Sequence, residues 1–258
     1  NGTAGAAVTI LNGETKILEA NGNPAQFIRV TRTDAADLSG AATLTLTNQF
    51  NNALGMDNVT SAEAAAGDTE YRAIMLKVDS ATEVKNVKAY IGILGTAGVS
   101  GGAQLAASGS GVVSLAVGNF SDWPDSGFCR IESSVGALKE IVYFSSRTTT
   151  SLTIPAAGRS QMGTAAQAGA ATDVINAIPG IRIAAETPIA DAVQTIGNES
   201  TAPTGVSWIT GITADTGIQF GDLATLIERA IWYERSVVAG ATAQASVLNL
   251  IHFSFDAA

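Results

Sequence analysis

The stretch "DWPDSGFCRIES" (residues 122–133) joins a turn sequence to a short strand pattern near the middle of the chain. Pro124 and Gly127 are typical of a tight turn, because proline fixes φ and glycine tolerates positive φ. The run after Gly127 alternates in character, which predicts a strand. Cys129, the chain's one cysteine, lies in this run, and we interpret it as a small buried side chain. A single thiol also excludes an intrachain disulfide.

Two runs of small residues lie on either side of this stretch, and they indicate flexible borders. They are "GTAGVSGGAQLAASGSG" (95–111) and "GTAAQAGAATDVINAIPG" (163–180). Between them, "KEIVYFSSRTTTSLTIPAAGR" (139–159) predicts two short strands around a threonine-rich turn. We therefore predict that residues 99–176 form a small inserted β module.

The chain before this module is predicted to consist mainly of strands. The pair Asn12-Gly13 lies between two apolar runs, which favours a hairpin with a type I′ turn. Thr60 and Glu63 have capping-box spacing, which predicts a single helical turn. Alternating patterns predict further strands over residues 25–33, 41–50, 71–78 and 83–94.

The chain after the module returns to strand patterns. Strands are predicted within "GVSWITGI" (205–212), "RAIWYERSVVAG" (229–240) and "SVLNLIHFSF" (246–255). Residues 220–234 also fit a helix with Asp222 as its N-cap, but we favour a turn followed by a strand.

The composition argues against several classes of function. Of the 258 residues, 46 % are apolar and 14 % are charged, which is unlike a disordered chain. The formal charge of −9 and the lack of a basic cluster argue against nucleic acid as a partner. No apolar run reaches the roughly 18 residues needed to span a bilayer. The first residues carry no signal-peptide pattern, and we expect no membrane partner.

The sequence offers few residues for catalysis, so we expect neither an enzyme nor a bound cofactor or metal. His252 is the only histidine, which excludes a two-histidine metal site, and its alternating strand predicts that it is packed. No glycine-rich phosphate-binding motif is present. Asp68 with Glu70, and Asp34 with Asp37, are the candidates for calcium or for a glycosidase pair. We interpret these four as turn carboxylates.

Three stretches resemble segments of structural proteins of tailed bacteriophages. The first precedes and includes the strand predicted over 71–78, and it matches at Asp57, Glu63, Gly67, Asp68, Glu70, Tyr71 and Arg72. The second matches at Asn198, Glu199, Ala202, Pro203, Gly205, Val206, Gly221, Asp222, Leu223, Ala230, Ile231, Trp232, Arg235, Val237, Ala239 and Gly240. The third begins with the stretch at residues 122–133. At its C-terminal end it matches at Gly158, Arg159, Gly163, Thr164, Ala165, Gly169 and Ala170. The departures from these patterns are Tyr90, Gln167, Glu234 and Val238.

Together with the strand patterns, this resemblance implies an all-β protein. It implies an immunoglobulin-like β-sandwich formed by both chain ends, residues 1–98 together with 177–258, and a small β domain inserted at residues 99–176. None of the matching motifs is catalytic.

The resemblance also gives structural roles to the aromatic and turn residues of these motifs. It implies that Trp123 and Pro124 cap one end of the inserted module, and that Gly127 supplies its turn. Tyr71 and Trp232 are expected to be packing residues of the sandwich.

The function that the resemblance implies is a non-enzymatic structural role in a tailed-phage virion, assembled in many copies in the host cytoplasm. Expected partners are other virion proteins of the capsid or tail and further copies of the chain, which would make it a homo-oligomer. A decoration protein on the capsid exterior is favoured, and a tail, baseplate or fibre protein is the alternative. Two other classes stay open: a bacterial adhesin or pilus-like subunit, and a carbohydrate-binding protein or enzyme, for which 6 % aromatic residues are few.

Overall fold

The residues that the structure describes form three β-sheets. The computed structural model describes residues 5–10, 15–20, 23–32, 42–48, 60–79, 82–101, 105–186, 194, 196–241 and 250–257. Within these ranges the regular structure is almost entirely β-strand, with one α-helix of 6 residues. The prediction of an all-β protein is therefore confirmed.

Two five-stranded sheets are built from the two ends of the chain. The first has the order β1 (Gly5–Ile10), β4 (Ala42–Asn48), β5 (Asp68–Val78), β16 (Glu228–Val237) and β14 (Ile181–Ala185). The second has the order β15 (Ile218–Leu223), β6 (Val84–Ile91), β17 (Leu250–Ala257), β3 (Asn23–Arg32) and β2 (Thr15–Ala20). Neighbouring strands are antiparallel except β17 and β3, which run parallel. We call these two sheets the sandwich.

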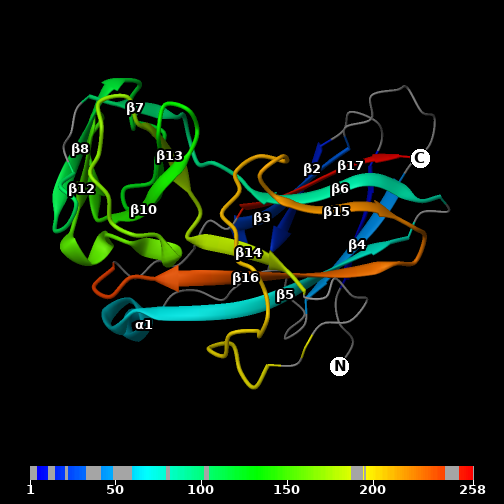
Figure 1. Ribbon diagram of the computed structural model, residues 1–258. Coiled ribbons are helices and arrows are strands. Elements are labelled where there is room, and N and C mark those ends of the chain that lie inside the picture. The colour runs from blue at the N-terminus through cyan, green and yellow to red at the C-terminus, as the bar shows by residue number, and fades with distance from the viewer. Residues whose placement is uncertain are drawn as a thin grey trace.

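One apolar core lies between the two sheets of the sandwich, which lie one over the other in Figure 1. Ile74, Leu76 and Val78 alternate along β5 and are buried, as the two-residue period of a strand requires. They pack in one cluster with apolar side chains of β6, β14, β15, β16 and β17.

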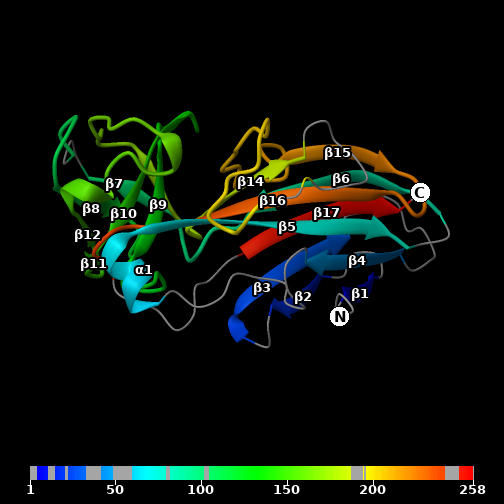
Figure 2. The ribbon, with the colours of Figure 1, turned by 90° about the horizontal axis from the view of Figure 1, so that it is seen from below.

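The third sheet has seven strands, all of which lie between Gly98 and Ile178. Its order is β10 (Leu138–Phe144), β9 (Gly127–Glu132), β13 (Val174–Ile178), β7 (Gly98–Ser100), β8 (Gly111–Val117), β12 (Ser151–Ile154) and β11 (Ser146–Arg147). A second apolar core, which includes Trp123 and Cys129, belongs to this sheet. We call this sheet and its connections the module, and Figure 2 shows it at one end of the sandwich.

The two connections between sandwich and module run side by side. The chain leaves the sandwich after β6 and returns to it at β14. The Leu94 N–H, just after β6, donates to the Ala177 carbonyl in β13 at 2.8 Å. This hydrogen bond joins the segment that enters the module to the strand that leaves it.

The predicted capping box is confirmed in helix α1 (Ser61–Ala66). The Thr60 hydroxyl accepts the Glu63 N–H at 3.2 Å, and the Glu63 carboxylate accepts the Thr60 N–H at 2.6 Å. The next residue after the helix, Gly67, has φ 77°, which favours glycine. The helix therefore ends where the sequence predicts, and β5 follows directly.

The turn-and-strand interpretation of residues 220–234 is also confirmed. β15 and β16 occupy this region, and Leu226 lies in the turn between them. Alternate apolar residues of β16 face the sandwich core. This two-residue period is that of a strand and not of a helix.

The predicted hairpin at Asn12-Gly13 is wrong, although these two residues themselves lie outside the described ranges. β1 pairs with β4 in the first sheet, whereas β2 pairs with β3 in the second. Six residues of β1 are paired along β4. Long-range strand pairing of this extent outweighs a local turn preference.

The two runs of small residues are not simple linkers. β7 lies within the first run and β13 within the second, and both occupy central positions in the seven-stranded sheet. Small residues are needed there because neighbouring side chains approach closely. A Cβ atom at Gly98 would lie 2.5 Å from the Leu115 side chain. The low-complexity composition thus reflects close packing in this part of the module.

The strand predicted within residues 205–212 is absent, since only an isolated bridge pairs Ile209 with Ile183 there. Trp208 and Val206 instead pack over the outer face of the first sheet, on the side away from the sandwich core. The alternating pattern therefore belongs to a covering segment that partly buries its apolar side chains without forming a ladder.

Candidate functional site

Trp123 is buried at the point where the chain enters the module. Its ring packs against Phe120 and Phe144, with ring centroids 4.5 and 6.0 Å away. Its indole N–H donates to the Thr96 carbonyl at 2.8 Å. The side chain therefore fills the module core and also holds the connection that follows β6.

The turn around Trp123 fixes the same connection by further contacts. The Asp122 carboxylate accepts the N–H and the hydroxyl of Thr96 at 2.8 and 2.7 Å, and these bonds lower the pKa of Asp122. The Pro124 carbonyl accepts the Arg147 Nε–H at 3.1 Å. Gly127 has φ 156° and lies against Pro124. The turn thus closes the module where it meets the sandwich.

Trp232 and Tyr71 lie together on the outer face of the first sheet. Trp232 is completely buried, and its indole N–H donates to the Glu186 carboxylate at 2.7 Å. The Tyr71 ring lies 5.7 Å from the Trp208 ring. Burial, and then the nearby Glu234 carboxylate, raises the pKa of Tyr71. Both predicted packing residues contribute to one aromatic cluster.

The first two of the three motif stretches contact each other in the fold, at β5 and at the segment 198–240. Glu70 of β5 forms a buried ion pair with Arg235 of β16. Arg72 pairs with Glu199 at 2.7 Å, and the Glu199 carbonyl accepts the Tyr71 N–H at 2.7 Å. Residues more than a hundred positions apart in the sequence therefore fix one end of the first sheet.

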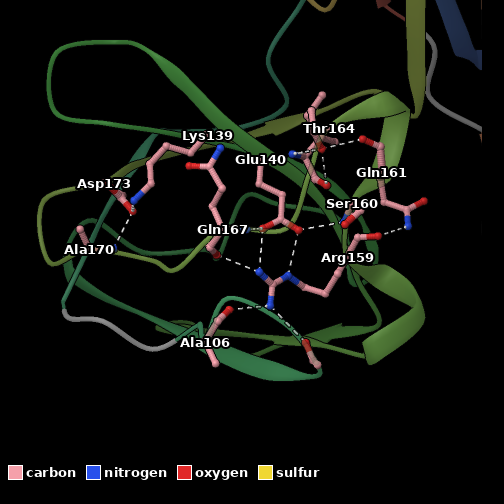
Figure 3. A network of polar contacts seen from close by, with 12 residues as sticks. Ala106, Lys139, Glu140, Arg159, Ser160, Gln161, Thr164, Gln167, Ala170 and Asp173 are labelled. Carbon is pink, nitrogen blue, oxygen red and sulfur yellow. Dashed lines mark hydrogen bonds and ion pairs between the residues drawn. The ribbon is translucent and has the colours of Figure 1, made fainter.

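Glu140 and Arg159 form a buried bidentate ion pair in the module (Figure 3). The guanidinium donates to the two carboxylate oxygens at 2.9 and 2.8 Å, and also to carbonyl oxygens of the loop 106–109 and of Gln167. The carboxylate accepts the N–H groups of Ser160 and Gln167 at 2.8 and 3.0 Å. Gln167 contributes only backbone atoms to these bonds, so the network does not depend on its side chain.

The calcium candidates Asp68 and Glu70 lie close to a third carboxylate, Glu63. Their nearest oxygens are within 4.8 Å of one another. Each carboxylate already has a partner: Glu63 caps α1, Asp68 accepts the Thr69 N–H at 2.7 Å, and Glu70 pairs with Arg235. These contacts account for the cluster as part of the fold.

His252 and Cys129 occupy the packed positions that the sequence predicts for them. His252 stacks on Tyr90, with ring centroids 4.8 Å apart. Cys129 is completely buried in the module core, and this burial raises the pKa of its thiol.

A groove of about 350 Å³ lies between the module and the sandwich. Residues from both units line it, among them Arg130, Leu138 and Met162 of the module and Arg182, Trp208 and Thr210 of the sandwich. The sequence does not predict this groove, because its walls come from segments that only the fold brings together. One signal was present: Arg130 and Arg182 each interrupt an apolar strand, which is typical of arginines held in buried ion pairs.

Two arginines cross the groove in opposite directions. Arg130 donates through Nη1 to the Thr210 carbonyl and hydroxyl at 2.8 and 3.1 Å. Arg182 donates through Nη1 to the Met162 carbonyl at 3.4 Å. Each unit thus contributes one arginine that bonds to the other unit beside the groove.

Each of the two arginines pairs with a carboxylate that does not line the groove. Arg130 pairs through Nε with Glu132 at 2.8 Å, and Arg182 pairs through two nitrogens with Glu234, both at 2.7 Å. The Arg182 guanidinium also lies 5.2 Å from the centroid of the Trp208 ring. The guanidinium groups are therefore held rigidly at the groove wall.

Comparisons of the chain with protein-family models, with curated proteins and with solved structures found no match. No helix in the described ranges is long and apolar enough to cross a membrane.

Proposed function

We propose that this protein is a non-enzymatic structural component of a tailed-phage virion, and that it acts by assembling in many copies. The favoured role is an accessory decoration protein on the capsid exterior, whose partners are capsid subunits and copies of itself. In this proposal the sandwich is immunoglobulin-like, and residues 99–176 form a domain inserted into it.

The observation that carries the proposal is how the motif residues are used. Glu70, Tyr71 and Arg72 from one motif contact Glu199 and Arg235 from the other. Catalytic side chains converge on a shared cavity. These motif side chains instead contact one another and hold one end of the first sheet. The same is true of Glu140 and Arg159, which bind loops of the module. Motifs of this kind support a structural role.

The surface chemistry is consistent with assembly rather than with binding of nucleic acid. The formal charge is −9, and the arginines that line the groove are already paired with carboxylates. Assembly of such a chain would rest mainly on apolar contact and on pairing of sheet edges. A virion location without contact to DNA or to a membrane follows from the proposal.

A sedimentation experiment tests this function. The tagged protein would be mixed with empty shells, and separately with isolated tails, of the phage that encodes it, both prepared from a mutant that lacks it. Sedimentation with shells at a near-stoichiometric ratio is expected for a decoration protein. An unrelated β-rich protein of similar size and net charge is the control.

The other outcomes are equally decisive. Sedimentation only with tails would replace the decoration role by a tail or baseplate role. Failure to sediment with either particle would overturn the virion proposal, and an adhesin would then be the class to test, by binding to bacterial cells.

A further inference from the structure

The turn between β9 and β10 holds a valine that its own chain leaves uncovered. Val135 is 87 % exposed, the highest value among the exposed large apolar side chains in the described ranges, and Leu138, three residues later, is 38 % exposed. Single exposed apolar side chains are ordinary on protein surfaces. Val135 differs from them because its turn is fixed by hydrogen bonds and because the groove between module and sandwich lies beside it.

Hydrogen bonds within the turn hold the backbone around Val135 in one conformation. The Gly136 N–H donates to the Ser133 carbonyl and the Ser133 N–H donates to the Ala137 carbonyl, both at 2.8 Å. The Ala137 N–H donates to the Ser133 hydroxyl at 3.2 Å. Turn positions usually carry glycine, asparagine, aspartate or serine, so the turn itself does not need a valine. An apolar side chain on such a fixed turn loses little conformational freedom when it binds.

The groove begins beside this turn. Leu138 lines the groove, and the Cα atoms of Val135 and Leu138 lie at most about 11 Å apart, because only three residues separate them. Met162 and Trp208 add apolar surface to the wall. A projecting apolar side chain and a partly apolar hollow are therefore neighbours on the surface of the molecule.

The charges around the groove favour a neutral occupant. Among the described residues that line it, the charged ones are Arg130 and Arg182, which pair with Glu132 and Glu234. The turn segment 133–138 (SSVGAL) carries no charge. Because each chain has a formal charge of −9, two copies repel each other unless they meet through uncharged surface. The turn of a second copy therefore matches the groove in charge and in apolar character.

We propose that two copies of the chain form a dimer in which each copy inserts Val135 into the groove of the other. The contact is reciprocal, because a two-fold axis that brings one turn to the opposite groove also does the reverse. The groove volume of about 350 Å³ lies at the lower end of the range for binding pockets, which suits a single turn of chain. The inference rests on the proposed function, because it names the contact through which copies of such a protein would assemble.

Analytical ultracentrifugation of the full chain over a range of concentrations tests the dimer. A species of twice the chain mass is expected to increase with concentration. Its dissociation constant should stay constant or fall as salt rises from about 0.05 M to about 0.5 M, because salt screens the repulsion between two acidic copies and leaves apolar contact in place. A monomer at every concentration, or a dimer that dissociates as salt rises, would overturn the proposal.

Two matched valine variants locate the contact. Val135→Ser removes an exposed apolar side chain and is expected to weaken the dimer by at least about tenfold, because the loss occurs twice in each dimer. Val117→Ser is the control, since Val117 is 65 % exposed in β8 and does not line the groove. It should leave the dissociation constant unchanged. Thermal unfolding of both variants checks that the fold is kept, and equal effects on the dimer would count against Val135 as the contact.

A double-mutant cycle tests that Val135 meets the groove and not another surface. Leu138→Ser alters the groove wall and is also expected to weaken the dimer. The combined variant Val135→Ser with Leu138→Ser should weaken it less than the two separate effects added together, because side chains in contact are not independent. Fully additive effects would contradict insertion into the groove. If Leu138→Ser does not fold, the valine pair remains a complete test.

The particle experiment separates this inference from the proposed function. If Val135→Ser is a monomer yet sediments with shells like the wild-type protein, both proposals stand, and the contact operates between copies only. If the wild-type protein dimerises through Val135 and sediments with no particle, the dimer stands and the virion role is wrong. If the protein sediments with particles but stays a monomer in solution, the virion role stands and the dimer is wrong.

Discussion

Glu140 is a carboxylate that the fold keeps charged inside the module. Burial alone would raise its pKa, but the hydrogen bonds from Arg159, Ser160 and Gln167 outweigh burial and lower the pKa below its ordinary value of 4.5. Because the folded protein has the lower pKa, the charged group stabilises it above the unfolded pKa. That stabilisation is lost as the pH falls through the folded pKa.

The Glu140→Gln variant tests this linkage. It is expected to lower the free energy of unfolding by about 3–5 kcal/mol near neutral pH, because Arg159 is left buried without its counter-charge. The difference from the wild-type protein should shrink at an acidic pH below the lowered folded pKa, where the wild-type carboxylate is itself protonated. Urea unfolding at both pH values measures it. The control is Asp125→Asn, whose exposed pair with Arg147 should change the free energy by less than about 1 kcal/mol.

Cys129 is expected to be inert in the folded protein. Its burial raises the pKa of the thiol, and only the thiolate reacts with disulfide reagents. Absorbance with a chromogenic disulfide at about pH 8 should show essentially no reaction in buffer and one thiol per chain in guanidinium. Rapid labelling of the folded protein would contradict the packed position of Cys129.

At the scale of the elements, the turn between β15 and β16 contains a strained residue. Leu226 has φ 65°, a left-handed conformation that disfavours a branched side chain. It is also 64 % exposed, so its side chain contributes little to packing. The Leu226 N–H donates to the Val78 carbonyl at 2.7 Å, which joins the turn to β5 and stabilises its left-handed backbone conformation.

Leu226→Gly is therefore expected to be neutral or to stabilise the protein by up to about 1 kcal/mol, because relief of strain offsets the added flexibility of glycine. Val117→Gly is the matched control, since Val117 is 65 % exposed but lies in strand β8. It should destabilise by about 0.5–1 kcal/mol. Thermal unfolding of both variants measures the difference. A larger loss for Leu226→Gly than for Val117→Gly would contradict the strain.

The elements also show what the sequence can and cannot predict. The capping box at Thr60 and most strands of the sandwich follow from local patterns and were correctly predicted, whereas β14 and β15 were not predicted. The pairing of β1 with β4 was not, because it depends on residues far away in the chain. The segment at 205–212 was mistaken for a strand because alternation records which side chains are buried, and not whether a ladder forms.

The same distinction, between local patterns and contacts of distant residues, applies to the candidate functional residues. The packing roles of Trp123, Tyr71 and Trp232 follow from their size and from the motifs around them. The groove does not, because Arg130 and Thr210 lie 80 residues apart and meet only when the module docks on the sandwich.

At the scale of the whole molecule, the module and the sandwich share part of one core. Phe128, Tyr143 and Ile178 of the module belong to the apolar cluster of the sandwich. A Cβ atom at Gly180 would lie 2.8 Å from the Phe128 ring, which shows how closely the two units pack. Their unfolding is therefore expected to be coupled into a single transition.

Phe128→Ala tests this coupling. It removes the ring at the junction and is expected to cost about 3–5 kcal/mol. It is also expected to split or broaden the single calorimetric transition, as each unit then melts with less support from the other. Val112→Ala, at an exposed position in β8, is the control and should leave one sharp transition. A single transition in Phe128→Ala, merely shifted to lower temperature, would show that other contacts couple the two units.

The hydrogen bond between Leu94 and Ala177 has a consequence for how such a chain can change over evolutionary time. Because the segment between them departs and returns at neighbouring points, its exposed loops can be lengthened without moving its two ends, whereas loss of the whole segment would also remove Phe128, Tyr143 and Ile178 from the shared core. A different segment inserted at this place in the sandwich would have to bring its own two ends together within the length of one hydrogen bond.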